Sequence, residues 1–333
     1  MNIAPFASHH VSEAAELVAA RFRALRTQQP ILPEHFANPA LIEPKISHLA
    51  STSPGVVALE AGKLCGFLLG MPLAEFKGRR AVYCPEWSHG AILEDSSRIY
   101  QAMYRELAPA WISDGRFLHV LTIFANDRSG LDAWFWQGFG MLVIDAVREL
   151  NPVPCQPRHD VVIRRMRRED IEDVQRHDEA LRRHLAAAPI YLSYVHQEGA
   201  TQFEEWLPGT ELVMFVAERE GKIVASLGVG PANKDARPTI EDPGTGSILT
   251  AYTAPEVRNL GIGATLLAAA VAHLLNIGKT RCAVDFESQN IPAVRFWLQH
   301  FTPVCYSVMR TVDDRIAWAG AERPTGTFWR SAA

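Results

Sequence analysis

The sequence predicts a mixed α/β protein made of two domains with a similar order of elements. The chain has 333 residues, of which 48% are hydrophobic and 21% charged, and this length exceeds what a single core of ordinary size organises. Three prolines fall within residues 151–157, near the middle of the chain, and proline at this density interrupts helices and strands alike. We therefore expect a first domain over residues 1–150, a linker over 151–158, a second domain over 159–318 and a C-terminal tail over 319–333.

Apolar periodicity and turn signals define the elements of the second half. Glu220-Gly221-Lys222 is a hairpin signal, and the longest apolar helix carries leucines and alanines at helical spacing before it ends at Gly278. The expected strands cover residues 162–166, 212–217, 223–229, 247–253, 281–287 and 304–312. The expected helices cover residues 169–185, 202–207, 263–276 and 292–300.

The first half repeats this plan. Its expected strands cover 56–59, 64–69, 119–125 and 141–147, with a hairpin signal at residues 61–63, and its expected helices cover 96–111 and 131–136. Aligning Phe139 with Phe301 also aligns Phe124 with Phe286, and it places the pair Trp134-Phe135 on Phe296-Trp297. One register satisfies three aromatic features, which indicates an internal duplication.

The composition excludes several functional classes. A net charge of −4 offers no basic face for nucleic acid, and no run of about 18 apolar residues offers a membrane span. Residues 1–11 lack the charged start and apolar core of a secretory signal. The five cysteines lie far apart without a CxxC pair, and no histidine pair has zinc-ligand companions. We expect a cytoplasmic protein that uses no metal, nucleic acid or membrane, while its oligomeric state stays open.

The most informative segment is a glycine-rich turn between the strand 247–253 and the helix 263–276. It contains Arg258, Gly261 and Gly263. Glycines at a helix start leave backbone N–H groups accessible, the helix dipole adds partial positive charge, and an arginine adds a cation. The turn therefore predicts a site for a phosphate or pyrophosphate. The alternative is that the glycines only allow close packing of helix and strand, with Arg258 as a solvated surface residue.

The order of strand, RxxGxG turn, apolar helix, strand and Asn-x-x-Ala with paired aromatics resembles the GNAT superfamily of N-acetyltransferases. The matching residues are Arg258, Gly261 and Gly263 in the turn, then Asn290, Ala293, Phe296, Trp297 and Phe301. The resemblance implies two tandem α/β domains, each with a central, mostly antiparallel sheet flanked by helices. It implies that acetyl-CoA is the co-substrate and that the turn binds its pyrophosphate.

The resemblance also assigns the residues that bind acetyl-CoA. Backbone N–H groups of the turn would hold the pyrophosphate, the preceding strand would pair with the pantetheine arm and supply an oxyanion contact, and Asn290 would lie near that arm. Asn290 has a second interpretation as the cap of the following helix, and Tyr252 as an ordinary strand aromatic. The implied cofactor-binding residues are Ala251, Tyr252, Thr253, Arg258, Asn259, Leu260, Gly261, Ile262, Gly263, Ala264 and Asn290.

The catalytic residues are less defined. The family often has a tyrosine where this chain has Trp297, and that tyrosine protonates the departing thiolate. We take Tyr306 as the substitute acid and Asp285 as the general base, because aspartate is depleted in strands. The alternatives are a sheet-packing tyrosine and a solvated carboxylate.

The two helical regions that cover the acceptor site in the family carry histidines and aromatic residues. They are either a pocket lining or the packed side of amphipathic helices. The residues are His177, His184, Tyr191, Tyr194, His196, Phe203 and Trp206.

The first half has no glycine at residues 96–101, which align with the turn, so it resembles a degenerate copy. The expected function is transfer of acetyl from acetyl-CoA to an amine on a small molecule or peptide, by direct attack in the C-terminal domain. The alternatives are a non-catalytic acetyl-CoA-binding sensor or scaffold and, far behind, a dinucleotide-binding domain.

Overall fold

The computed structural model describes residues 1–155, 159–193, 201–207, 209–232 and 238–316. Contacts between residues divide the chain into two compact units. The first unit consists of Met1–Thr27, His35–Leu142 and the chain from Cys305 onward. The second consists of Gln28–Glu34 and Val143–Val304. Each unit has a mixed sheet flanked by helices, so the predicted fold class is confirmed.

The first unit contains two sheets. One has the order β1-β2-β3-β6 and is antiparallel throughout, while the other has the order β4-β5-β7-β14 with a parallel pair between β5 and β7. The strands are β1 (Asn2–Pro5), β2 (Gly55–Glu60), β3 (Lys63–Leu69), β4 (Met71–Phe76), β5 (Arg79–Cys84), β6 (His89–Ala91), β7 (Leu118–Phe124) and β14 (Thr302–Thr311). The helices are α1 (Val11–Gln28), α2 (Glu43–Thr52), α3 (Ser96–Ser113) and α4 (Arg128–Trp136).

The second unit has one sheet with the strand order β9-β10-β11-β12-β13-β8. All its neighbours are antiparallel except β12 and β13. The strands are β8 (Gly140–Glu149), β9 (Val162–Arg165), β10 (Val213–Arg219), β11 (Lys222–Pro231), β12 (Thr245–Thr253) and β13 (Arg281–Glu287). The helices are α5 (Ile171–Ala186), α6 (Thr201–Glu204), α7 (Ile262–Asn276) and α8 (Ile291–His300).

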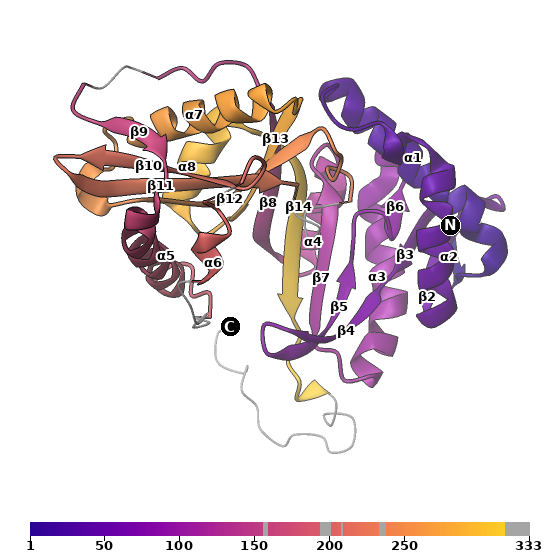
Figure 1. The fold of residues 1–333 in the computed structure, drawn as a ribbon. Coiled ribbons are helices and arrows are strands. Elements are labelled where there is room, and N and C mark those ends of the chain that lie inside the picture. Colours follow the sequence, from indigo (N-terminus) through magenta and orange to yellow (C-terminus); the bar gives the residue numbers. More distant parts are fainter. Residues whose placement is uncertain (156–158, 194–200, 208, 233–237, 317–333) are drawn as a thin grey trace. The chain divides into compact units, whose positions relative to one another are not determined.

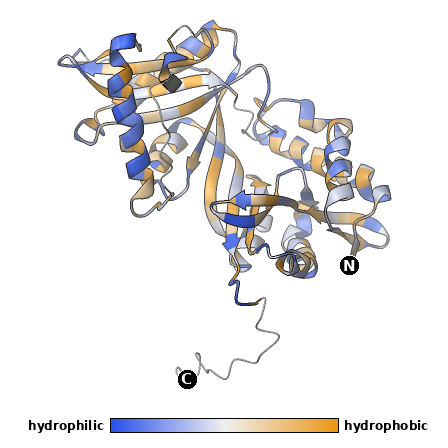
Figure 2. Ribbon diagram, turned by 60° about the horizontal axis from the view of Figure 1, so that its bottom comes forward, coloured by the Kyte–Doolittle hydropathy of each residue, from blue (hydrophilic) through white to orange (hydrophobic). Residues whose placement is uncertain are grey.

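Two helices of the second unit cover opposite faces of the sheet (Figure 1). The apolar α7 buries Leu266, Leu267, Ala270 and Leu274 and contacts β10, β11 and β12. On the other face α5 packs through Ile171 and Val174 against the buried side chains of β10. Its remaining residues are mostly polar, and Figure 2 shows this helix largely blue. The amphipathic pattern of α5 and the uniform apolarity of α7 therefore explain which helix lies half in solvent.

The parallel neighbours β12 and β13 diverge. They pair only through Thr245–Ser247 and Arg281–Ala283, and over the rest of these two described strands no partner residues are matched between them. The pairing of β12 with β11 shifts register between Gly228 and Val229 and skips Leu249. A bulge of this kind increases the local twist and re-aims the strand. The second half of β12 is thus separated from β13, and this separation creates the space for the site.

Each unit takes one strand from the other half of the chain. Residues 143–149 of β8 pair with β13, and residues 305–311 of β14 pair with β7. The compact units therefore differ from the predicted division at residues 150 and 159. Both strands are apolar and follow a short aromatic helix, so their hydrophobic patterns are alike and do not specify which unit each joins.

Some residues with an expected role lie outside the described residues. They are 156–158 of the expected linker, the whole tail expected over 319–333, Tyr194 and His196. Within the part of the chain that the structure covers, no helix has the length and apolar composition needed to cross a bilayer.

Candidate functional site

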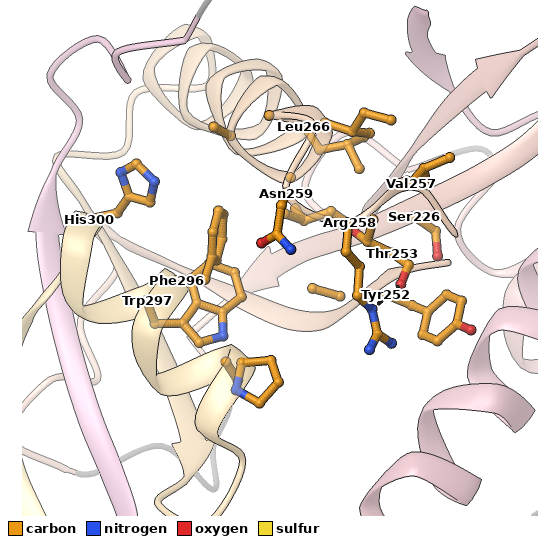
Figure 3. Close-up of a pocket in the computed structure, with 18 of the residues that line it drawn as sticks. Ser226, Tyr252, Thr253, Val257, Arg258, Asn259, Leu266, Phe296, Trp297 and His300 are labelled. Atoms are coloured by element: carbon orange, nitrogen blue, oxygen red, sulfur yellow. Dashed lines mark hydrogen bonds between the residues drawn. The ribbon is translucent and has the colours of Figure 1, made fainter. Parts of the chain in front are cut away.

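A pocket of about 450 Å³ lies in the second unit where β12 and β13 diverge. Its walls come from the end of β12, the turn that follows, the first turns of α7, and α8 (Figure 3). Leu181 and His184 of α5 and Ser226 and Leu227 of β11 complete it. Of the implied cofactor-binding residues, the described lining includes Ala251, Tyr252, Thr253, Arg258, Asn259, Gly261, Ile262, Gly263, Ala264 and Asn290. Leu260 is absent from that lining and is 39% exposed.

The turn presents a helix start to the pocket. Gly261 is the N-cap of α7, it has a φ of 81°, and no side chain caps the helix there. The first backbone N–H groups of a helix have no acceptor within the helix, and the residues that carry them in α7 line the pocket. A Cβ atom on Gly261 would meet nothing within 4 Å. The residue is therefore needed for its left-handed backbone, which costs about 1–2 kcal/mol for other L-residues, and not for packing.

Gly263 has a different role from Gly261. A Cβ atom there would lie 3.3 Å from Cε2 of Phe296, which is tighter than ordinary contact. The close approach of α7 to α8 thus accounts for Gly263, whereas the packing alternative expected a contact between helix and strand. Of these two glycines, Gly261 is the one that packing does not explain. A Cβ atom there would face open space at the start of the helix.

Arg258 is anchored to the strand before the turn. Its Nε donates a hydrogen bond of 3.0 Å to the carbonyl oxygen of Thr253, and the side chain lines the pocket (Figure 3). This bond fixes the direction of a planar cation whose remaining N–H groups suit bidentate contact with an anionic oxygen pair. The turn therefore combines an open helix N-terminus with a positioned guanidinium, which is the chemistry of a phosphate site.

Asn290 caps α8 and lines the pocket as well. Its Oδ1 accepts hydrogen bonds from the backbone N–H of Ala293, at 3.5 Å, and from Nε2 of His184, at 3.1 Å. The cap interpretation of Asn290 is confirmed, and the residue also joins α8 to the last turn of α5. Because both of these hydrogen bonds use Oδ1, the amide nitrogen of Asn290 remains for other contacts.

Aromatic rings of α8 form one wall of the pocket. Trp297 is 6% exposed, and its ring packs edge-on against Phe296 at 4.8 Å between centroids. Behind this wall, Phe301, the residue after α8, packs edge-on against Trp297 at 5.5 Å. His300 follows on the same wall, and burial together with the positive charge of Arg148 lowers the pKa of its imidazole. The GNAT superfamily usually has a glycine at the position of His300, before Phe301. This difference was the signal in the sequence that could have identified His300 as a residue of the pocket.

The two expected catalytic side chains are not among the described residues that line the pocket. Asp285 lies on β13 with an exposed side chain, opposite Asp145 of β8. Tyr306 belongs to the first unit, where it pairs with Ile123 of β7 and the guanidinium of Arg128 lies 5.4 Å from its ring centre. Asp285 is exposed on β13, and the pairing of β14 with β7 places Tyr306 in the first unit, so the structure brings neither side chain to the described lining and the proposal below does not use them.

Comparison with known proteins identifies this region. Residues 179–301 match the family described as Acetyltransferase (GNAT) family. This part of the chain is a GNAT domain. The domain begins inside α5 and ends at Phe301, so it contains every described lining residue of the pocket except Pro154.

Solved structures extend the likeness beyond the GNAT domain. A GCN5-related N-acetyltransferase from Sphaerobacter thermophilus superposes with a TM-score of 0.54 at 14% identity, covering 93% of this chain and 95% of that one. The glucosamine N-acetyltransferase region of a fungal multi-domain β-N-acetylglucosaminidase gives 0.50 at 13% identity, covering 92% of this chain and 38% of that one. At these identities the likeness concerns the fold, and it spans both halves of the chain. No curated protein matches the sequence.

Proposed function

We propose that the GNAT domain binds acetyl-CoA in this pocket and transfers its acetyl group to an amine. The observation that carries the proposal is the turn 258–263, which places the uncapped N-terminus of α7 and the guanidinium of Arg258 on one pocket. Both features favour a pyrophosphate by charge and by hydrogen bonding. The third glycine of a dinucleotide fingerprint is missing, which disfavours the dinucleotide alternative.

The diverging end of β12 suits the pantetheine arm. Ala251, Tyr252 and Thr253 pair with β11 on one edge, whereas the other edge has lost its pairing with β13 after Ser247. Backbone groups on that edge are available to an amide-containing arm, as a strand partner would use them. A backbone N–H on the same edge can stabilise the oxyanion that forms when an amine attacks the thioester carbonyl.

The acetyl group arrives as a thioester, and the products are an amide and a thiol. The amine nitrogen forms the new bond to the carbonyl carbon, the carbon–sulfur bond breaks, and one proton passes from nitrogen to sulfur overall. A thiol of pKa about 8.5, the cysteine reference, leaves without a strong acid beside it. The replacement of the family tyrosine by Trp297 is therefore compatible with turnover.

The first unit is better described as a copy without this site. Buried side chains lie at the start of its helix α3, because the hydroxyl of Ser96, the first residue of α3, donates to Asp127 Oδ1 at 2.8 Å, and Arg21 Nη2 lies 2.6 Å from Asp127 Oδ2. All three residues are at most 3% exposed. An anion at this helix start would have to displace a buried carboxylate, so we infer that acetyl-CoA binds the second unit alone.

Calorimetry with acetyl-CoA tests the site through a matched pair of glycines. Gly261 and Gly278 lie at opposite ends of α7, both have a φ near 80° (81° and 79°), and neither Cβ would meet an atom within 4 Å. We expect Gly261→Asp to weaken binding at least about tenfold, since a carboxylate repels the pyrophosphate, and Gly278→Asp to leave it unchanged. Both variants place a side chain on a left-handed backbone, so Gly278→Asp controls for that strain, and thermal unfolding of the two variants separates lost binding from lost stability. Equal binding by both variants would reject the site.

A thiol-release assay over small-molecule and peptide amines separates the enzyme from its main alternative. The absence of the family tyrosine favours a non-catalytic acetyl-CoA sensor, which would bind tightly and turn over no amine. Release of thiol that depends on one amine, with the amide found in equal amount, supports the transferase.

A further inference from the structure

A serine and a histidine form a buried pair at one side of the pocket. Ser226 lies on β11 opposite Tyr252 and lines the pocket, and its Oγ is 3.1 Å from Nδ1 of His177 on α5. Ser226 is 4% and His177 9% exposed. Figure 3 shows Ser226 beside Thr253 and Tyr252, at the end of the strand along which the thioester is proposed to lie. Neither residue has a role in the acetyl-CoA contacts described above.

The direction of the pair depends on the tautomer of His177. A neutral imidazole has one donor nitrogen and one acceptor nitrogen, and a hydroxyl can serve as the partner of either. In the tautomer with an unprotonated Nδ1, Ser226 donates its hydroxyl hydrogen to His177, and its oxygen lone pairs remain for a donor in the pocket.

The surroundings of His177 favour a neutral ring that can accept a proton. Burial is the largest influence and lowers the pKa of the imidazole below its ordinary 6.5. Asp173 on the same helix and Glu256 in the turn after β12 oppose this through their negative charge, whereas Arg176 adds to it. The ring of Tyr252 packs against the imidazole at 4.9 Å between centroids. A neutral base with two carboxylates in its field accepts a proton near neutral pH more readily than an isolated buried one.

We propose that Ser226 and His177 form the proton relay of the acetyl transfer, which rests on the function proposed above. As the amine nitrogen bonds to the carbonyl carbon, it gives a proton to Ser226 Oγ, and the hydroxyl proton of Ser226 moves to His177 Nδ1. The carbon–sulfur bond breaks and the thiolate leaves with the bonding electron pair. The imidazolium then returns its proton through Ser226 to the thiolate or to water, which restores both residues. The base is thus a neutral histidine acting through a hydroxyl, and not the carboxylate expected from the sequence.

The pH profile of turnover distinguishes this relay from a purely structural tie between α5 and the sheet. We expect kcat/KM of the wild type to fall below pH 6.5 as His177 becomes protonated, in addition to the limb that the amine itself causes at higher pH. In His177→Gln, which retains a polar side chain beside Ser226, the acidic limb should disappear and kcat should fall by about 10²–10⁴. Acetyl-CoA affinity and thermal unfolding should stay within twofold and about 2 °C of the wild type.

Three further variants sharpen the result. Ser226→Ala should lose as much activity as His177→Gln, and the double variant should lose no more, because residues that act as a unit are not additive. Ser226→Thr should recover most of the activity. His273→Gln is the matched control, since His273 is another buried histidine of this unit whose imidazole pKa is lowered by burial, and it lies on α7 outside the described lining. It should leave the profile unchanged.

These experiments distinguish failure of the proton relay from failure of the proposed acetyl transfer. Turnover that keeps its acidic limb in His177→Gln, or that falls less than threefold, overturns the relay and leaves the transferase standing. Absence of turnover with every amine by the wild type overturns both. Nitrogen NMR of the resting protein gives an independent measure, because the relay requires Nδ1 of His177 to be the unprotonated nitrogen at pH 7. A proton on Nδ1 would reject it whatever the kinetics.

Discussion

Nε of Arg258 lies 3.0 Å from the carbonyl oxygen of Thr253, so the last residue of β12 holds the cation of the turn. The bond spans the 3₁₀ turn Pro255–Val257 and closes a short loop before α7. It uses one guanidinium N–H and keeps the plane of the group fixed beside the pocket. A lysine at this position would keep the charge without the plane or the tie.

Loss of this cation should weaken acetyl-CoA binding. Hydrogen bonds to charged groups contribute about 1.5–3 kcal/mol, so Arg258→Gln should raise Kd by about 10–150-fold, with Arg258→Lys between that variant and the wild type. The dependence of Kd on salt should also become shallower, since one charge contact has gone. Titration calorimetry at two salt concentrations measures both effects. Arg295→Gln is the control, because Arg295 is exposed on α8 and is not among the described lining residues; a similar loss there would mean that general charge, and not this contact, governs affinity.

Asn290 should contribute to stability through its cap. Removal of a capping side chain costs about 0.5–2 kcal/mol, and Asn290→Ala also deprives His184 Nε2 of its acceptor. We expect the free energy of unfolding to fall by about 1–2 kcal/mol in urea denaturation. Asn290→Asp should recover most of this, because a carboxylate caps a helix N-terminus and still accepts from His184. Equal loss in both variants would show that the amide nitrogen, and not the cap, carries the effect.

Removal of one charge from the buried ion pair of the first unit should lower the free energy of unfolding. Arg21 and Asp127 are 3% and 1% exposed at the side chain, and Asp127 also caps α4 through Gly130. Asp127→Asn keeps a capping group but leaves a buried guanidinium without its counter-charge, which costs about 3–5 kcal/mol. Arg21→Met combined with Asp127→Asn should recover at least half of that loss, because no unpaired charge remains. Denaturation of the single and double variants measures the coupling, and additive losses would contradict it.

The second unit was largely predictable because its signals are local. Each of these signals indicates the backbone conformation at its own position: the turn glycines, the apolar pattern of α7 and the asparagine before α8. All the expected strands and helices of this half have counterparts in the structure. The prediction of elements in the first half was less complete. Helices α1 and α2 and the hairpin of β4 and β5 were not predicted, since α1 is rich in alanine and arginine with a weak apolar stripe and β4 contains a proline.

The catalytic residues were harder to predict because they depend on tertiary contacts. Asp285 was chosen for its rarity in strands, yet only the sheet decides which face of β13 is covered. Ser226 has no distinctive neighbours in sequence, and its significance comes from His177, 49 residues away. The aligned register also shifts by one residue: Asp127 and Asn290 are the caps of α4 and α8, which superposes Trp134 on Trp297. The aromatic pattern favoured the other register, because it counts matching residue types and carries no information on where each helix is capped.

Two buried histidines should make the first unit sensitive to mild acid. His89 and His119 are at most 1% exposed, and burial lowers the pKa of their imidazoles to about 3 and about 4. Each ring donates Nε2–H to a backbone carbonyl and accepts from a tyrosine hydroxyl at Nδ1, an arrangement that needs the neutral form. In the unfolded chain both histidines titrate near 6.5, so between pH 6.5 and about 4 the unfolded state binds more protons than the folded state. Stability is therefore full above pH 6.5 and falls with pH, by up to about 1.4 kcal/mol per pH unit for each ring.

Urea denaturation at intervals between pH 7 and pH 5 measures this slope before most carboxylates titrate. His89→Gln and His119→Gln should each lower the slope by up to about 1.4 kcal/mol per pH unit, because glutamine still has a donor for the carbonyl and an acceptor for the tyrosine but binds no proton. The double variant should keep only the shallower slope of the other histidines whose pKa burial lowers, His10, His177, His273 and His300, while being less stable than the wild type at pH 7. A wild-type stability that does not change from pH 7 to pH 5 would show that both rings are charged in the folded unit, and that their tyrosine partners do not hold them neutral.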